Sequence, residues 1–275
     1  MICVEGVWKS FGTQEVLRGV SLEVRSGEFM ALVGLSGCGK SVLLKHVVRL
    51  LEPDRGRVLV DGEDLAALSR RELEATRSRM GYLFQNSALF DSLTVYENVA
   101  FPLREKTRLG EGEIRRKVMS ELKVVGLENA EEKYPAQLSG GMVKRVALAR
   151  TLVRDPEIVL LDEPTTGLDP IVSRAILRLF ASVHRRRNLT GILVSHDVPA
   201  IFGIVEKVAM LHGGKIVAVE PSTEARASRN PMLAQFVNGD AEGPIQHIET
   251  REEPAGPALP LELELEDAVQ KPGVK

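Results

Sequence analysis

Short apolar runs alternate with amphipathic stretches along most of this chain. Three runs are nearly continuous in apolar residues and have the length of buried strands: residues 28–34, 157–164 and 191–197. Two stretches instead repeat apolar residues at helical spacing: residues 41–53, which we expect to end at Pro53, and residues 171–187. Strands of this kind separated by helices predict an α/β fold with a parallel sheet that helices cover on both faces.

Two other segments depart from this alternation. Residues 208–220, VAMLHGGKIVAVE, are typical of a hairpin that turns at Gly213 and Gly214. The segment between Gln85 and Ala136 is polar and helical and lacks strand alternation. It therefore predicts a helical insertion that the sheet domain carries.

The composition changes to proline, glycine and glutamate from about Gly239. The alternation LELELE could pair as an edge strand, but a short acidic segment between prolines is more typical of a solvated tail. We therefore expect residues 239–275 to form an acidic and largely disordered extension.

The charge and the cysteine content narrow the class of protein. A formal net charge of -2 over 275 residues argues against binding to nucleic acid or to an anionic bilayer surface through charge. No apolar run reaches membrane-spanning length, and the start MICVEGVWKS lacks the pattern of a secretory signal. Cys3 and Cys38 are too few for a disulfide framework or a metal site and fit a reducing cytosol. Any membrane role is therefore expected to come through a partner.

The first candidate for chemistry is GLSGCGKS, which fits the phosphate-loop pattern G-x-x-x-x-G-K-[ST] between an expected strand and an expected helix. Its glycines let backbone N–H groups converge on phosphate oxygens, Lys40 reaches the β- and γ-phosphates of ATP, and the Ser41 hydroxyl ligates Mg²⁺. The predicted nucleotide-binding residues of this loop are Gly34, Ser36, Gly37, Cys38, Gly39, Lys40, Ser41 and Val42.

Further polar residues follow the expected strands. The run IVLLDEP delivers Asp162 to the carboxyl end of a strand, where it can hold Mg²⁺, and places Glu163 to polarise a water in line with the γ-phosphate. His196 and Gln85 also follow apolar runs. Taken alone each is an ordinary loop residue, and His196 becomes a candidate contact of the γ-phosphate because its strand should lie in the same sheet. Gln85 is a similar candidate, because its amide could coordinate Mg²⁺ or water.

The stretch LSGGMVKRVALAR predicts a second anion site, because Ser139, Gly140 and Gly141 open a helix N-terminus. These residues are not expected to serve the nucleotide of their own chain, which the phosphate loop already surrounds. A head-to-tail dimer with two-fold symmetry would instead hold two ATP molecules, each between the phosphate loop of one chain and LSGG of the other.

These motifs, with GLD at 167–169 and SHD at 195–197, occur in the order and spacing of the ABC ATPases, which the chain resembles from about residue 2 to residue 238. The resemblance implies an ABC ATPase fold over residues 1–238. Its parts would be a RecA-like P-loop NTPase core, an N-terminal antiparallel β subdomain and a helical subdomain of about residues 86–150.

The same resemblance implies roles for single residues. Phe11 would stack on adenine, with Trp8 as the alternative, and Asp169 would lie at the seam of the dimer. The residues implied to be catalytic are Glu163, His196 and Gln85. Gln85 would also link the nucleotide site to a transmembrane partner.

Three stretches resemble more closely the ATPase of the Mla-type phospholipid-trafficking systems, which work with MCE-domain proteins: residues 83–109, Met142 where most relatives carry Gln, and QFVNGDAEGP at 235–244. This resemblance implies a homodimer on the cytoplasmic face of the inner membrane, held there by transmembrane permeases and sometimes joined by a STAS-domain protein. The implied cargo is phospholipid or another hydrophobic molecule. Residues 235–250 would contact the neighbouring ATPase subunit.

Two other functions remain open at this point. The ATPase of a small-solute importer would share every catalytic motif and differ only in the three stretches above. A non-transport ABC ATPase acting in cell division would share the catalytic motifs as well. DNA-repair members are disfavoured because the interval from Lys40 to Ser139 leaves no room for a long coiled coil, and translation-type members because they usually carry two cassettes.

Overall fold

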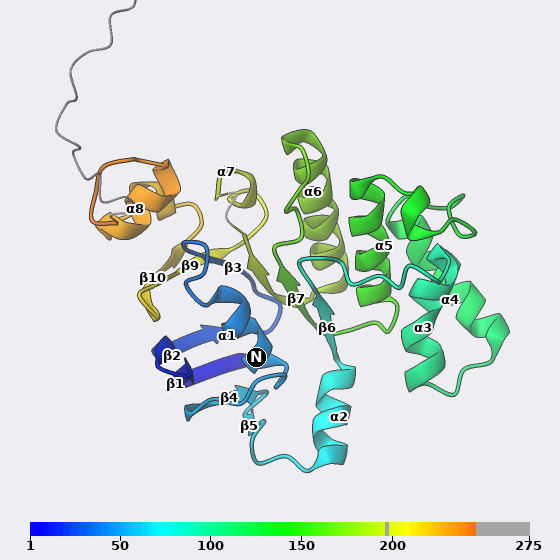
Figure 1. The fold of residues 1–275 in the computed structure, drawn as a ribbon, viewed down its shortest axis with the longest axis horizontal. Coiled ribbons are helices and arrows are strands. Elements are labelled where there is room, and N and C mark those ends of the chain that lie inside the picture. The colour runs from blue at the N-terminus through cyan, green and yellow to red at the C-terminus, as the bar shows by residue number, and fades with distance from the viewer. Residues whose placement is uncertain (196–197, 246–275) are drawn as a thin grey trace, which may run out of the picture.

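The centre of the computed structural model, which describes residues 1–195 and 198–245, is a six-stranded sheet with the strand order β10-β9-β3-β8-β7-β6 (Figure 1). The strands are β3 (Phe29–Val33), β6 (Met80–Leu83), β7 (Ile158–Asp162), β8 (Thr190–Val194), β9 (Lys207–His212) and β10 (Lys215–Pro221). Neighbouring strands pair in parallel except β10, which is antiparallel to β9. The three predicted strands and the predicted hairpin are confirmed.

A second sheet is antiparallel and precedes most of the first in the chain. Its strands, in the spatial order β2-β1-β4-β5, are β1 (Ile2–Phe11), β2 (Gln14–Val24), β4 (Arg55–Val60) and β5 (Glu63–Asp64). The antiparallel N-terminal β structure that the family resemblance implies is therefore present.

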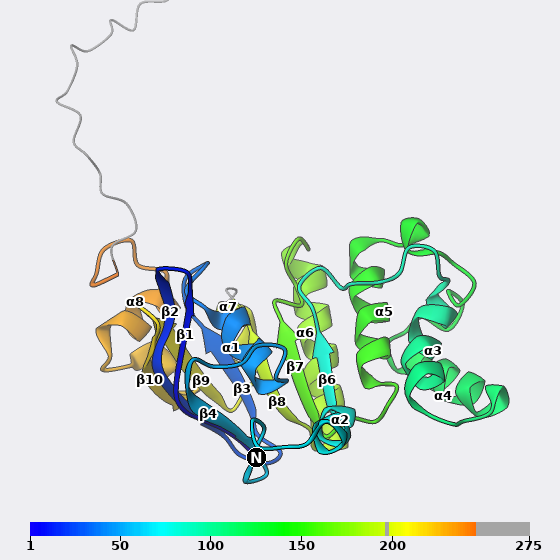
Figure 2. The same cartoon turned by 60° about the horizontal axis from the view of Figure 1, so that its bottom comes forward.

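The helices connect these strands and cover the sheets. They are α1 (Lys40–Val47), α2 (Arg70–Ser78), α3 (Val95–Lys106), α4 (Glu111–Val124), α5 (Gly140–Leu152), α6 (Pro170–Arg187), α7 (Val198–Ile201) and α8 (Pro231–Asn238), with short 3₁₀ turns η1 (Pro135–Gln137) and η2 (Ala225–Ala227). Ser69 and Thr94 begin α2 and α3 with capping boxes, because each hydroxyl accepts a backbone N–H and a glutamate three residues on reaches back. Figures 1 and 2 place α3, α4 and α5 together at one end of the molecule, with β10 and α8 at the other.

Both faces of the six-stranded sheet are buried. Along β3, Phe29, Ala31 and Val33 face a core that includes residues of α3 to α6, whereas Met30 and Leu32 face a core that includes residues of α1 and of the antiparallel sheet. This alternation of side chains, each with a buried partner surface, explains why the strand is apolar at every position. No helix among the described residues has the length and apolar character needed to cross a membrane.

The helix predicted over residues 41–53 is shorter than expected. It ends at Val47, Val48 caps it, and Arg49 adopts the left-handed backbone conformation with φ 52°. Arg77 of α2 donates hydrogen bonds to the carbonyl oxygens of Val48 and Arg49 at 2.9 and 2.6 Å. A distant side chain therefore satisfies the carbonyl groups at the helix end, and Pro53 does not terminate it.

The chain continues past α8 in contact with the core. The Gln235 side chain accepts a hydrogen bond from the backbone N–H of Ile245 at 2.7 Å and donates one to the carbonyl of the same residue at 3.1 Å. Ile245 is buried. Residues 239–245 are thus attached to α8, and the rest of the predicted extension, residues 246–275, lies outside the described residues.

Candidate functional site

The phosphate loop connects the carboxyl end of β3 to the N-terminus of α1, which is the context that its motif requires. Gly39 has φ 106°, and a Cβ atom there would lie 2.9 Å from Cγ1 of Val16. Gly34 has φ 146°, and a Cβ atom there would lie 2.2 Å from the carbonyl oxygen of Leu211. The loop can close this tightly only with glycine at both positions.

Lys40 folds its side chain back over this loop. Its Nζ atom donates hydrogen bonds to the carbonyl oxygens of Gly34 and Leu35 at 2.9 and 2.8 Å, and the residue is 4% exposed. Gly39 gives α1 no side-chain cap, and the first turn of the helix contains no acidic residue. A buried ammonium group beside an uncapped helix N-terminus forms a site for an anion such as phosphate.

Ser41 and Asp162 meet beside this loop. The Ser41 hydroxyl donates to Oδ1 of Asp162 at 2.7 Å, and the hydroxyl of Tyr82 donates to Oδ2 at 2.9 Å. Asp162 is 4% exposed at the carboxyl end of β7. The motifs predicted a Mg²⁺-binding role for both Ser41 and Asp162 but not their hydrogen bond, and Tyr82 was not predicted, because a tyrosine in an apolar strand is usually a core residue.

Glu163 and Gln85 are also brought together. Nε2 of Gln85 and the hydroxyl of Thr166 each donate a hydrogen bond to Oε2 of Glu163 at 3.0 Å. Glu163 follows β7 with φ 46°, a left-handed conformation that is uncommon for residues other than glycine, and its N–H donates to the carbonyl of Val194. The side chain therefore turns out of the sheet at the end of β7, where two neutral donors orient its carboxylate.

Two basic residues of α5 hold the loop that contains Gln85, and neither was predicted from the sequence. The Lys144 ammonium donates to the carbonyl oxygen of Gln85, and Arg150 donates to the carbonyls of Ser87 and Ala88 at 2.6 and 2.7 Å. Burial lowers the pKa of Lys144, and the nearby charge of Glu163 opposes that shift. Basic residues in a helix are usually solvated, so only the packed structure identifies these contacts.

The LSGG segment begins α5 and lies against the start of α6. Ser139 caps α5 by accepting the N–H of Met142 at 3.3 Å, and a Cβ atom on Gly141 would lie 2.7 Å from Val172. Asp169 caps α6 by accepting the N–H groups of Ile171 and Val172, both at 3.0 Å. Gly140 faces Leu168, and both Ser139 and Gly140 are exposed. Two helix N-termini therefore lie next to each other at the surface.

The remaining predicted residues differ in their exposure to solvent, and one of them is not described by the structure. Ser36 is exposed in the phosphate loop, and Val42 is partly buried against the core beneath α1. Met142, in the first turn of α5, is partly buried against the core around α5 and α6. His196 lies outside the described residues.

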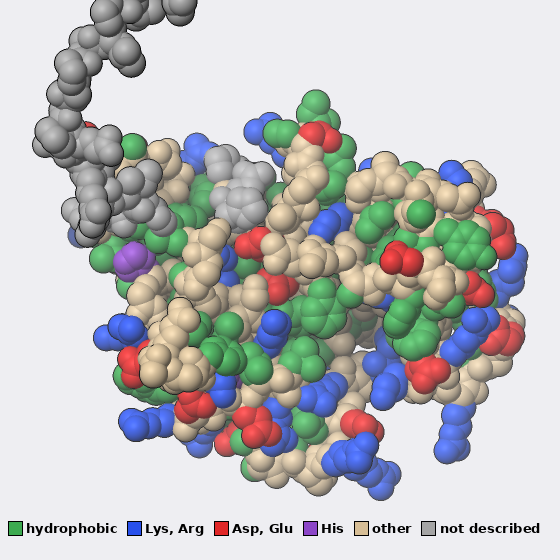
Figure 3. All heavy atoms as spheres, viewed as in Figure 1, with side chains coloured by type: hydrophobic (Ala, Val, Ile, Leu, Met, Phe, Trp, Pro, Cys, Tyr) green, Lys and Arg blue, Asp and Glu red, His purple; other side chains and the backbone are tan. Residues whose placement is uncertain are grey.

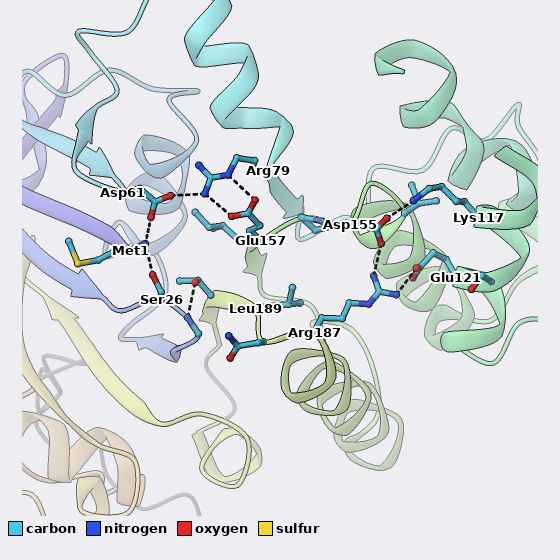
Figure 4. Close-up of a pocket in the computed structure, with 17 residues that line it drawn as sticks. Met1, Ser26, Asp61, Arg79, Lys117, Glu121, Asp155, Glu157, Arg187 and Leu189 are labelled. Carbon is cyan, nitrogen blue, oxygen red and sulfur yellow. Dashed lines mark hydrogen bonds and ion pairs between the residues drawn. The ribbon is translucent and has the colours of Figure 1, made fainter. Parts of the chain in front are cut away.

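A cavity of about 700 Å³ lies at the end of the six-stranded sheet that is opposite the phosphate loop (Figure 4). It is lined by residues such as Glu157 and Leu189, which directly precede β7 and β8, so it opens at the amino ends of the strands. Its charged side chains pair with each other, for example Arg79 with Asp61 at 2.7 Å and Arg187 with Glu121. The cavity is therefore separate from the phosphate loop, which follows a strand at its carboxyl end.

Phe11 and Trp8 differ in their suitability for stacking on a base. Phe11 is 47% exposed at the end of β1, with the Lys9 ammonium 5.7 Å from the centre of its ring. The Trp8 indole instead packs over Gly19, where a Cβ atom would lie 3.2 Å from the indole nitrogen. Phe11 therefore exposes more ring surface than Trp8 does.

Substitution of Phe11 by Ala is expected to weaken ATP binding by about tenfold, since stacking of a base on an aromatic ring contributes roughly 1–3 kcal/mol. Isothermal titration calorimetry with ATP measures the loss of affinity relative to the wild-type chain. The Trp8→Phe variant is the comparison, because it keeps an aromatic ring on Gly19. Unchanged ATP affinity in Phe11→Ala would contradict the stacking role of Phe11.

Alkylation of Cys38 is expected to abolish ATP binding, because the adduct would fill the phosphate loop. Burial raises the pKa of the Cys38 thiol, so labelling by N-ethylmaleimide should be slow at neutral pH and accelerate as the pH rises. The Cys3→Ser variant leaves Cys38 as the only thiol, which assigns the modification. ATPase activity that persists after complete labelling, verified by mass spectrometry, contradicts this prediction.

The chain is similar to known proteins of one family. Residues 17–166 match the ABC transporter family. The chain is 42% identical over 250 residues to the probable ribonucleotide transport ATP-binding protein mkl of Mycobacterium leprae, covering 91% of this chain and 72% of that protein. It is 41% identical over 235 residues to the intermembrane phospholipid transport system ATP-binding protein MlaF of Haemophilus influenzae, covering 86% of this chain and 89% of that protein.

The fold is similar to solved ATP-binding cassettes. One of them is a dimeric post-hydrolysis state of the cassette MJ0796 bound to ADP and Pi, with a TM-score of 0.74 and 33% identity, covering 81% of this chain and 99% of that one. The predicted family and fold class are thus confirmed. The chain belongs to the ABC transporter family, as one of its ATP-hydrolysing cassettes.

Proposed function

We propose that this cassette powers the movement of phospholipid, or of another hydrophobic molecule, between membranes. The proposed ATP hydrolysis rests on one observation, the position of the Glu163 carboxylate. Gln85 and Thr166 hold this carboxylate. It lies next to the pair formed by Ser41 and Asp162. The lipid part is supported by the similarity to MlaF, which extends over 89% of that protein.

The roles proposed for the site follow from its chemistry. The α1 N-terminus and Lys40 bind the phosphates of ATP, which places the γ-phosphate beside Ser41 and Asp162. Glu163 is the general base that accepts a proton from the attacking water, and Gln85 orients its carboxylate. His196 is proposed to contact the γ-phosphate.

Mg²⁺ fits the residues of this site. The described residues contain no cluster of three or more His, Cys, Asp and Glu side chains that could hold a metal by itself. A hydroxyl paired with one buried carboxylate, as in Ser41 and Asp162, is instead typical of Mg²⁺ that arrives with a nucleotide and keeps phosphate oxygens as ligands. Ser41 and Asp162 would hold the ion, and its charge would then offset the negative charge of the phosphates.

We propose that the second copy of the chain completes each ATP site. Ser139 and Gly140 are exposed, and α1 and α5 lie on opposite sides of β6 in both Figures 1 and 2. Ile171, next to the Asp169 cap, is 82% exposed. A head-to-tail dimer would cover Ile171 and bring LSGG to the partner's γ-phosphate.

The membrane partner is proposed to be a pair of permeases bound at the helical end of the molecule. Phe90 and Phe101 are 43% and 38% exposed, and their ring centres lie 4.8 Å apart. Figure 3 shows apolar side chains on the viewed face of the helical part. An exposed aromatic pair is typical of a protein interface. The cassette would then sit at the cytoplasmic face of the inner membrane, with MCE-domain and STAS-domain proteins as further partners.

Purification of a tagged Glu163→Gln chain from detergent-solubilised native membranes, with ATP present, tests this function. The substitution should slow hydrolysis and keep the ATP-bound dimer closed, so that partners remain attached and can be identified by mass spectrometry. Recovery of an MCE protein with its permease supports lipid trafficking. Recovery of a solute permease or of cell-division proteins instead would overturn the lipid assignment and leave the ATPase chemistry intact.

A further inference from the structure

Tyr82 reaches Asp162 from the neighbouring strand. Strand β6 pairs in parallel with β7, and Tyr82 lies opposite Leu160, two residues before Asp162. The length of the phenol side chain bridges this offset, and its hydroxyl lies 2.9 Å from Oδ2 of Asp162. The contact therefore depends on β6 being next to β7 at the edge of the sheet.

The two oxygens of Asp162 have different donors. Oδ1 accepts from Ser41 at 2.7 Å, and Oδ2 accepts from Tyr82 at 2.9 Å. Because this carboxylate is only 4% exposed, water cannot replace a missing donor without cost. One donor on each oxygen fixes the rotation of the carboxylate, which a single donor would leave free.

The tyrosine is itself held in place. Its ring contacts the ring of Phe84, with centres 4.4 Å apart at an angle of 42°, and packs against the core beneath α1. This packing keeps the phenol hydroxyl beside Asp162.

We propose that Tyr82 is a positioning residue for the Mg²⁺ that accompanies ATP, acting through the carboxylate of Asp162. This inference rests on the proposed role of Ser41 and Asp162 in holding the ion. Hydrogen-bond partners of a metal-binding carboxylate set its orientation, and losing one typically lowers metal affinity about 10- to 100-fold. Tyr82 acts on the ion without touching the nucleotide, so its loss should alter the Mg²⁺ requirement and leave Mg²⁺-free binding intact.

The Tyr82→Phe variant removes only the hydroxyl and keeps the ring on Phe84. We expect its affinity for ATP in EDTA to match that of the wild-type chain, while the Mg²⁺ concentration that gives half of the Mg²⁺-dependent gain in affinity rises roughly tenfold. Nucleotide binding measured by calorimetry across a Mg²⁺ titration gives both values without relying on turnover. Tyr134→Phe is the matched control, because that side chain is exposed and lies in the helical part.

The Asp162→Asn variant separates this inference from the proposed function. If Asp162→Asn raises the Mg²⁺ requirement and Tyr82→Phe does not, Tyr82 has no positioning role, and the proposed role of Asp162 stands. If neither variant changes the Mg²⁺ requirement, Asp162 does not serve the ion, and both proposals fail. An equal loss of ATP affinity with and without Mg²⁺ in Tyr82→Phe would indicate a structural role only and also overturn the inference.

Discussion

The Glu163→Gln variant is expected to bind ATP with wild-type affinity and to hydrolyse it at least about 100-fold more slowly, because general-base catalysis contributes roughly 10²- to 10⁴-fold. The amide has the shape of the carboxylate and can still accept from Thr166, so the loop after β7 should keep its conformation. The amide cannot, however, take a proton from the attacking water. Phosphate release at saturating ATP, with calorimetry for affinity, measures the two effects separately.

Glu74→Gln is the control for this substitution, since Glu74 is an exposed residue of α2. Its ATPase rate should stay within about twofold of wild type, as is usual for exposed positions remote from a site. Retention of more than about a tenth of the wild-type rate by Glu163→Gln would show that another group accepts the proton.

Lys40→Ala and Ser139→Arg are each expected to abolish ATPase activity alone and to restore it when mixed. Lys40→Ala removes the buried ammonium of the phosphate loop, and Ser139→Arg places a large side chain at the exposed start of α5. In a dimer with one chain of each kind, the intact phosphate loop of the Ser139→Arg chain faces the intact LSGG of the Lys40→Ala chain. One complete site is thereby rebuilt.

An equal mixture that exchanges subunits freely should regain about a quarter of wild-type activity, because half of the dimers are mixed and each has one of two sites complete. Each variant incubated alone is the control. If LSGG served the nucleotide of its own chain, both chains in the mixture would remain incomplete and no activity would return. Phosphate release as a function of the mixing ratio distinguishes the two arrangements.

Features set by neighbouring residues were predictable from the sequence. The phosphate loop depends on glycines that tolerate positive φ and on the helix N-terminus that follows, all within residues 34–41. The buried strands were predictable because apolar residues at every position suit a sheet that is covered on both faces. The family followed from the order of such local motifs.

Features that need two distant segments were not predictable in this way. The early end of α1 involves a hydrogen bond from Arg77 of α2 to a carbonyl at the helix end. The loop that contains Gln85 is held by a hydrogen bond from Lys144 of α5 to the Gln85 carbonyl. In each case a polar side chain satisfies a backbone carbonyl far away in the sequence, and the sequence pattern classes such a side chain as solvated.

The sequence by itself determined the motif residues of the site, the strands that carry them and the family. Only the tertiary structure decided how these groups are oriented, as in the contacts of Tyr82 with Asp162 and of Gln85 with Glu163. The physical reason is that strand order sets these contacts. Hydrophobic burial makes each strand apolar without specifying its neighbour, so the pairing of β6 with β7 becomes evident only in the assembled sheet.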